Sequence, residues 1–125
     1  MRLLLDTHVL LWWLADDPTL SPAAREAIAR AEAEVAVSAA SAWEISIKRE
    51  LGKLRAPDDL GPQLTRHRFQ ALPIMVAHAL LAGSLPRHHD DPFDRMLAAQ
   101  ARLEGMTPVT RDPRLGLYGV PTLPA

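Results

Sequence analysis

Four acidic residues lie far apart in the sequence at positions from which a folded chain could bring them together: Asp6, Glu44, Asp94 and Asp112. Asp6 ends an apolar segment of the kind that forms a strand buried on both faces of a parallel sheet. The carboxyl ends of such strands are where open α/β sheets bind ligands. Converging carboxylates repel one another unless a cation offsets their charge, and hard oxygen ligands favour Mg²⁺ or Mn²⁺. Such an ion activates water and offsets charge on a phosphodiester, so the pattern indicates a metal-dependent site acting on phosphodiesters.

Each of these acids also has a structural interpretation. Asp6 could cap the helix that follows it, and Glu44, expected in the first turn of a helix, could interact with the helix dipole. Asp94 falls at the third position of a helix for which Asp91 is the expected N-cap, a pattern similar to a capping box. Asp112 precedes a proline, which is common in turns.

The elements expected to position the acids alternate between strands and helices. This alternation predicts an α/β fold with three layers, α/β/α, around a central, mainly parallel sheet. Ser21 and Ser41 are expected to cap helices, and Gly52 and Gly105 to end them. Strands are expected at residues 2–6, 35–38, 69–74 and 106–109, with a short one within 119–123. Helices are expected at residues 7–15, 23–33, 42–51, 60–67, 76–81 and 92–104.

Length and composition narrow the class of protein. The chain has 125 residues, which predicts a single domain spanning residues 1–125. It has no cysteine, which excludes disulfides, cysteine-based zinc sites and a thiol nucleophile, and which fits a reducing cytosol. Charged and polar residues within the apolar segment 3–14 argue against a signal peptide or a membrane span.

The basic residues form short clusters rather than an overall excess. The net charge is −1, so the whole chain lacks the basic signature of nucleic-acid binding. Basic clusters occur within residues 48–55, 66–68 and 87–89, and each is interpreted either as solvated surface or as a group of phosphate contacts. His88 and His89, in the loop before the helix at 92–104, have the same two interpretations.

Several stretches resemble the PIN-domain family, specifically the VapC-type toxins of bacterial type II toxin–antitoxin systems. They occur in the order typical of that family and together extend over nearly the whole chain. They are Leu4–Trp13, Val37–Ile45, Leu51–Leu54, Asp91–Ala101 and Val109–Asp112. The resemblance implies a PIN-like fold and an endoribonuclease that depends on Mg²⁺ or Mn²⁺.

The resemblance also implies roles for individual residues. The expected metal-binding and catalytic residues are Asp6, Glu44 and Asp94, with Asp112 as a more variable fourth. Two residues are expected to support the site, Thr110 by hydrogen bonding and Asp91 beside it. Lys48, Arg95 and Arg111 are expected to help place the RNA.

The expected partners are an RNA substrate, a cognate antitoxin and a second copy of the chain in a homodimer, in the cytoplasm and not at a membrane. An antitoxin would bind as an amphipathic helix in a groove. The apolar run Leu10–Leu14 could face such a partner or the core of the protein itself. RNA loops with splayed bases are the expected targets.

Two other functions fit the same residues. One is a housekeeping PIN nuclease that processes RNA and has no antitoxin. The other is a non-catalytic binding module in which the carboxylates only cap helices.

Overall fold

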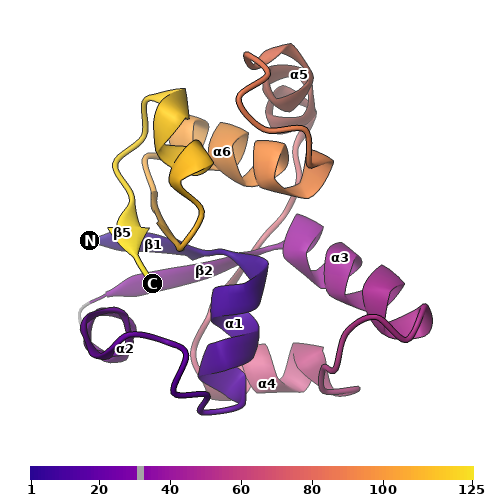
Figure 1. Cartoon of the computed structure of the whole chain (residues 1–125), viewed down its shortest axis with the longest axis vertical. Coiled ribbons are helices and arrows are strands. Elements are labelled where there is room, and N and C mark those ends of the chain that lie inside the picture. The colour runs from indigo at the N-terminus through magenta and orange to yellow at the C-terminus, as the bar shows by residue number, and fades with distance from the viewer. Residues whose placement is uncertain (31–32) are drawn as a thin grey trace.

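A five-stranded sheet with the strand order β3-β2-β1-β4-β5 organises the molecule, and every strand pair within the described residues is parallel (Figure 1). The computed structural model describes residues 1–30 and 33–125. The strands are β1 Arg2–Leu5, β2 Glu34–Ser38, β3 Gln70–Leu72, β4 Thr107–Thr110 and β5 Leu123–Pro124. The expected parallel sheet is confirmed.

Helices cover both faces of this sheet. In Figure 1, α1, α2 and α4 lie on one side of the strands, α5 and α6 lie on the other, and α3 extends from the end of β2. The helices are α1 Thr7–Leu14, α2 Pro22–Ala29, α3 Ala39–Glu50, α4 Leu60–Arg66, α5 Val76–Ser84 and α6 Pro92–Glu104, followed by the 3₁₀ helix η1 Pro113–Tyr118. The expected three-layer α/β/α arrangement is therefore confirmed.

The alternation of side chains along β1 explains why its apolar run is continuous. Leu3 and Leu5 belong to a core cluster with residues of α1 and α2, whereas Leu4 packs with Leu97 of α6 on the other face. All three leucines of β1 are fully buried. Because successive strand residues point to opposite faces, both faces of β1 need apolar side chains.

The apolar run at the start of α1 packs mostly on the protein's own core. Val9 and Leu10 are buried, and the next four residues, Leu11 to Leu14, are partly buried and pack against the same cluster. Leu10 is therefore core, while Leu11 to Leu14 pack on the core and keep some exposed surface, so a contact of these four with a partner stays a prediction.

The start of α3 differs from the expected one. Ser38, not Ser41, is the N-cap, because its hydroxyl accepts a hydrogen bond from the Ala40 N–H at 3.0 Å. Ser41 is instead buried inside the helix. Glu44 consequently lies in the second turn, so the expected dipole interaction in the first turn is wrong.

Other helix and strand boundaries also differ from the expected ones, because of the local backbone conformation or because a strand lies at the edge of the sheet. The helix expected at residues 23–33 ends at Ala29, since Arg30 is extended; residues 31–32 of that prediction lie outside the described residues. The strand expected at 69–74 is reduced to β3, which lies at the edge of the sheet. The helix expected at 76–81 continues as α5 to Ser84. The 3₁₀ helix η1 was not expected, and it ends at Gly119, which has a φ of 78°. The last strand therefore begins only at Leu123.

The remaining caps agree with expectation. Ser21 caps α2 and Asp91 caps α6, and each helix has a proline in its first turn. Gly105 ends α6 with a φ of 66°, a conformation that glycine adopts at little cost.

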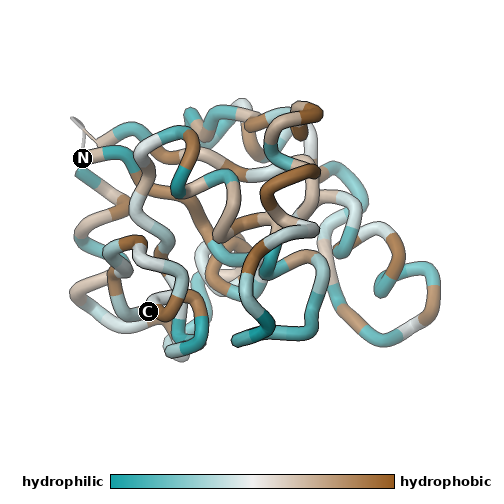
Figure 2. The backbone as a smooth tube through the Cα atoms, turned by 90° about the horizontal axis from the view of Figure 1, so that it is seen from above, coloured by the Kyte–Doolittle hydropathy of each residue, from teal (hydrophilic) through white to brown (hydrophobic). Residues whose placement is uncertain are grey.

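Hydrophobic and hydrophilic residues alternate along the chain, as Figure 2 shows. Within the part of the chain that the structure describes, no helix is long and apolar enough to cross a membrane.

Candidate active site

A pocket of about 300 Å³ opens at the carboxyl ends of β1 and β4. The four acids singled out in the sequence all line it, and Asp91 lines it with them. They come from four separate segments: the β1–α1 junction, α3, the start of α6 and the β4–η1 junction. The sheet topology thus brings together carboxylates that are up to about one hundred residues apart in the sequence.

Asp6 has the capping role considered for it from the sequence, and it also lines the pocket. Its Oδ1 accepts a hydrogen bond from the His8 N–H at 2.9 Å and so caps α1. Its Oδ2 accepts from the hydroxyl of Thr110 at 2.8 Å. Burial raises the pKa of Asp6, although these hydrogen bonds oppose the shift. Thr110, at the end of β4, therefore holds this carboxylate in place, as the resemblance implied.

Glu44 is buried on the pocket-facing side of α3. Its Oε1 accepts a hydrogen bond from the hydroxyl of Thr7 at 2.7 Å, and its Oε2 is 2.5 Å from Nζ of Lys48, one turn further along the helix. The hydrogen bond to Glu44 raises the pKa of Lys48. Lys48 also lines the pocket and thus places a positive charge beside the acids.

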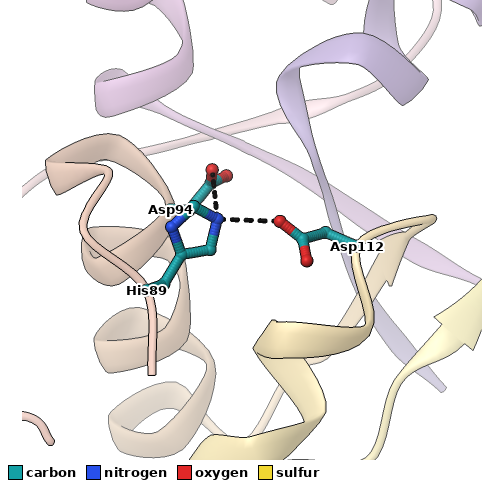
Figure 3. Close-up of side chains that lie close together, drawn as sticks. All are labelled: His89, Asp94 and Asp112. Atoms are coloured by element: carbon teal, nitrogen blue, oxygen red, sulfur yellow. Dashed lines mark hydrogen bonds and ion pairs between the residues drawn. The ribbon is translucent and has the colours of Figure 1, made fainter. Parts of the chain in front are cut away.

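His89 lines the same pocket and lies between Asp94 and Asp112, as Figure 3 shows. Its Nε2 lies 2.7 Å from Oδ2 of Asp112 and 3.1 Å from Oδ2 of Asp94. Its Nδ1 accepts a hydrogen bond from the Asp91 N–H at 3.1 Å, so the proton of the neutral ring is on Nε2 and faces the two carboxylates. His89 is only 5% exposed, so its interpretation as a solvated loop residue is wrong.

Sequence reasoning missed this role of His89. The residue precedes the N-cap Asp91 by two positions, close enough to bond to the start of α6, and this proximity was the available signal. Asp112 lies in a different segment, and nothing local indicates that β4 places it against His89.

The pKa values of the two carboxylates that contact His89 are shifted in opposite directions. Burial, together with the charges of Asp6 and Asp91, raises the pKa of Asp94 to about 7, and His89 opposes this shift. Burial would also raise the pKa of Asp112, but hydrogen bonds from Arg114 and His89 outweigh it and lower the pKa to about 2. Asp94 is thus the acid that is held protonated to the highest pH, first by burial and then by the neighbouring negative charges.

Asp91 and Asp112 also stabilise helix starts. Oδ1 of Asp91 accepts from the Phe93 N–H at 2.8 Å, and Oδ1 of Asp112 accepts from the Arg114 N–H at 2.9 Å. Asp94, in the first turn of α6, caps nothing in the structure and lies 20% exposed at the pocket. Capping therefore accounts for Asp91 and Asp112 in part, and it does not account for Asp94.

The two arginines that were expected to contact RNA are placed differently. Arg111 lines the pocket, where its guanidinium carbon lies 4.7 Å from the centre of the Trp12 ring and one nitrogen donates to the C-terminal Ala125 carbonyl at 2.8 Å. Arg95 is not among the residues lining the pocket. It donates to the carbonyls of Ala82 and Leu85, both at 2.8 Å, and so holds the end of α5.

The donor set suits a divalent cation. Ligand atoms of His89, Asp94 and Asp112 lie within 4.8 Å of one another, and Asp6 and Glu44 add carboxylate oxygens to the same pocket. Carboxylate oxygens predominate, which favours Mg²⁺ or Mn²⁺ over a softer metal.

Comparison with known proteins supports these observations. Residues 3–120 match the PIN domain family. The chain is 36% identical over 115 residues to ribonuclease VapC22 of Mycobacterium tuberculosis strain H37Rv, an alignment that covers 90% of this chain and 88% of that protein.

Solved structures share the fold at low sequence identity. VapBC2 from Rickettsia felis, bound to a DNA fragment from its promoter, aligns with a TM-score of 0.72 at 16% identity and covers 99% of this chain and 98% of that one. FitAcB from Neisseria gonorrhoeae aligns with a TM-score of 0.60 at 18% identity, covering 97% and 96%. A toxin–antitoxin complex from Klebsiella pneumoniae also gives 0.60, at 17% identity, covering 87% and 85%.

Proposed function

The chain belongs to the PIN domain family, and from this premise we propose that it is a metal-dependent endoribonuclease, the toxin of a toxin–antitoxin pair. The observation that carries the proposal is the convergence of Asp6, Glu44, Asp94 and Asp112 on one pocket at the carboxyl edge of the sheet. The ribonuclease name of the 36%-identical relative supports the choice of RNA as the substrate. We treat residues 1–125 as a single domain.

The same four carboxylates would hold Mg²⁺ or Mn²⁺. Burial and, after it, repulsion from the neighbouring acids raise the pKa of Asp94, and a bound cation would offset both effects, which supports this assignment. When bound, the metal supplies activation of water and charge compensation for the phosphodiester. The chain's own part is to fix the oxygen donors, through Thr110 at Asp6 and Thr7 at Glu44.

Basic residues at the pocket are proposed to hold the RNA backbone. Lys48 and Arg111 both line the pocket, so a phosphate bound at the acids would lie near their positive charges. Arg95 donates to backbone carbonyls before α6, and we therefore assign it to positioning that segment rather than to RNA contact.

The proposed partners follow from the structural neighbours, which are toxin–antitoxin complexes. We propose a protein antitoxin that blocks the pocket, and a homodimer as the form of the toxin. Co-purification of the chain with the product of an adjacent small gene tests the first, and light scattering of the purified chain tests the second.

The central experiment is induced expression in bacterial cells of the wild type, Asp94→Asn and Asp90→Asn, followed by measurement of growth and mapping of new RNA ends. Asp90 provides a matched control because it is an exposed aspartate four residues away that does not line the pocket. We expect growth arrest and discrete new RNA ends with the wild type and Asp90→Asn, and neither with Asp94→Asn.

Three other outcomes would change the proposal. Cleavage by a folded Asp94→Asn protein at the wild-type rate would contradict the proposed site. Discrete cleavage without growth arrest would favour a housekeeping nuclease, and no cleavage by any of the three proteins would favour a non-catalytic binding module.

A further inference from the structure

Two aromatic side chains meet beside the acidic pocket, one from α3 and one from α6. The rings of Trp43 and Phe93 lie 5.5 Å apart between centres at an angle of 76°, an edge-to-face pair. Phe93 is half-buried, whereas Trp43 is 62% exposed in the described structure. A contact of this kind fixes the indole while leaving much of its surface accessible.

Each of these rings directly precedes an acid of the pocket. Trp43 is followed by Glu44, and Phe93 is followed by Asp94. Neither ring lines the pocket itself, but the backbone places each ring one residue from a carboxylate that does. Lys48, which is bonded to Glu44, adds a positive charge on the same helix.

The surroundings of Trp43 on α3 are mostly polar. Its exposed neighbours one and two turns further along are Ser46, Arg49, Glu50 and, at the C-cap, Leu51, while Ile47 is half-buried. A helix face that docks on another protein typically continues as an apolar stripe over several turns. On this side of α3, whose residues are all described, the exposed apolar side chains are limited to Trp43 and Leu51, and the exposed residues between them, Ser46, Arg49 and Glu50, are polar or charged. A fixed indole beside a cation and a phosphodiester site has the composition of a single-stranded nucleic-acid surface.

We propose that Trp43, held by Phe93, is a stacking platform for an unpaired RNA base next to the phosphate that binds at the acids. This inference rests on the proposed function and specifies the substrate class, RNA that is single-stranded at the nucleotide beside the cleaved bond. A base within a duplex has both faces covered by its neighbours, so it cannot stack on the indole without leaving the helix.

The test compares two probes on the purified full-length chain, with Ca²⁺ in place of Mg²⁺ or Mn²⁺ so that the carboxylates are neutralised, and with the probes checked to be intact after each measurement. One probe is an unstructured RNA of about 12 nucleotides, within the range that single-strand sites cover, and the other is the same ribose-phosphate chain without bases. The variants are Trp43→Ala, Trp43→Leu, Trp43→Phe and, as a control, Leu51→Ala. Leu51 is also 62% exposed and follows the same helix, but unlike Trp43 it is not adjacent to a pocket acid in the sequence and has no ring on which a base could stack.

Because stacking of one base on an aromatic ring is typically worth a factor of about 10 in affinity, we expect Trp43→Ala and Trp43→Leu to weaken binding of the base-bearing RNA roughly 10-fold. Their binding of the abasic chain should be unchanged. Trp43→Phe should retain most of the affinity, and Leu51→Ala all of it. Trp43→Leu keeps apolar bulk at the position, so it separates stacking from a general loss of contact or folding.

Three results would overturn the inference. Equal binding of both probes by the wild type and Trp43→Ala would exclude a stacked base. Wild-type affinity in Trp43→Leu would show that apolar bulk suffices. A change of oligomeric state in Trp43→Ala, measured by light scattering, with unaltered RNA binding would assign the indole to contact with a second copy. In each of these cases RNA cleavage by the wild type in cells would leave the proposed function standing, whereas its absence would overturn both.

Discussion

Two clusters in this molecule each combine a buried histidine with at least one carboxylate, yet only one of them has the properties of a site. In the pocket cluster, His89 contacts both Asp94 and Asp112. In the cluster between α5 and α6, which we call the helix cluster, His78 contacts Glu104 alone, at 2.8 Å. The histidines are similarly buried, 5% and 2% exposed, so burial does not distinguish the two clusters.

In the helix cluster, one histidine is matched by one carboxylate, and both ring nitrogens of the histidine have hydrogen-bond partners. Nδ1 of His78 accepts a hydrogen bond from the Met75 N–H at 2.9 Å, which leaves Nε2 to donate to Glu104. Gln100 nearby accepts from the hydroxyl of Ser38 at 2.6 Å and donates to the Pro73 carbonyl at 3.2 Å. These bonds join α6 to the end of β2 and to the segment before α5, so the cluster fixes the packing of the helices.

The pocket cluster has more negative charge than its own partners neutralise. Five carboxylates line a cavity of about 300 Å³, and the pKa of Asp94 rises to about 7 as a result of burial and this repulsion. Among the described residues, every buried side-chain nitrogen or oxygen has a hydrogen-bond partner, in both clusters alike. The comparison teaches that unbalanced charge at an open pocket, rather than buried polarity, indicates function here.

The largest expected difference between the clusters is in their contribution to RNA cleavage. A glutamate-to-glutamine substitution in each cluster tests it. Glu44→Gln removes a pocket carboxylate and should reduce RNA cleavage by at least about 100-fold, at or beyond the upper end for loss of an outer-shell partner of a metal ligand. Glu104→Gln should leave the rate per folded molecule unchanged. The measurement is the cleavage rate of the RNA identified in cells, with added Mn²⁺. Equal losses in the two variants would contradict the distinction between the clusters.

The next effect concerns the pH dependence of stability without metal. The pKa of Asp94 is about 7 in the folded state and about 3.8 ordinarily, so the folded state binds the proton more tightly. The free energy of unfolding should therefore fall as the pH rises from about 4 to about 7, by at most about 4 kcal/mol. Asp94→Asn should remove this fall, and Mn²⁺ at pH 8 should stabilise the wild type more than the variant. If the free energy of unfolding has the same pH dependence in the two proteins, the raised pKa is not that of Asp94.

The smallest expected effect is structural. His78→Ala leaves the Met75 N–H without its acceptor in the helix cluster and should lower the free energy of unfolding by about 1–3 kcal/mol. His88→Ala is the control, since His88 is exposed. Urea unfolding gives the stabilities, and cleavage per folded molecule should stay at the wild-type value in both. A selective loss of cleavage in His78→Ala would show that the helix cluster takes part in the reaction.

Much of the fold could be predicted because its signals are local. The apolar run of β1, the serine and proline at the start of α2, and the cap and glycine that bound α6 each act within a few residues. The start of α3 could not be predicted, because Ser38 and Ser41 are both suitable caps by type and only the length of β2 selects between them. The 3₁₀ helix η1 was missed since its sequence has no apolar repeat of helical period.

The sequence by itself determined which residues are available for chemistry: carboxylates after apolar strands and at helix starts, no cysteine, and the stretches shared with the PIN domain family. Only the tertiary structure decided how they meet. It placed His89 between Asp94 and Asp112, turned Arg95 toward backbone carbonyls and left Trp43 exposed beside the pocket. The physical reason is that caps and strands depend on neighbours in the sequence, whereas a side chain's partners across the pocket depend on the order and register of strands that are far apart along the chain.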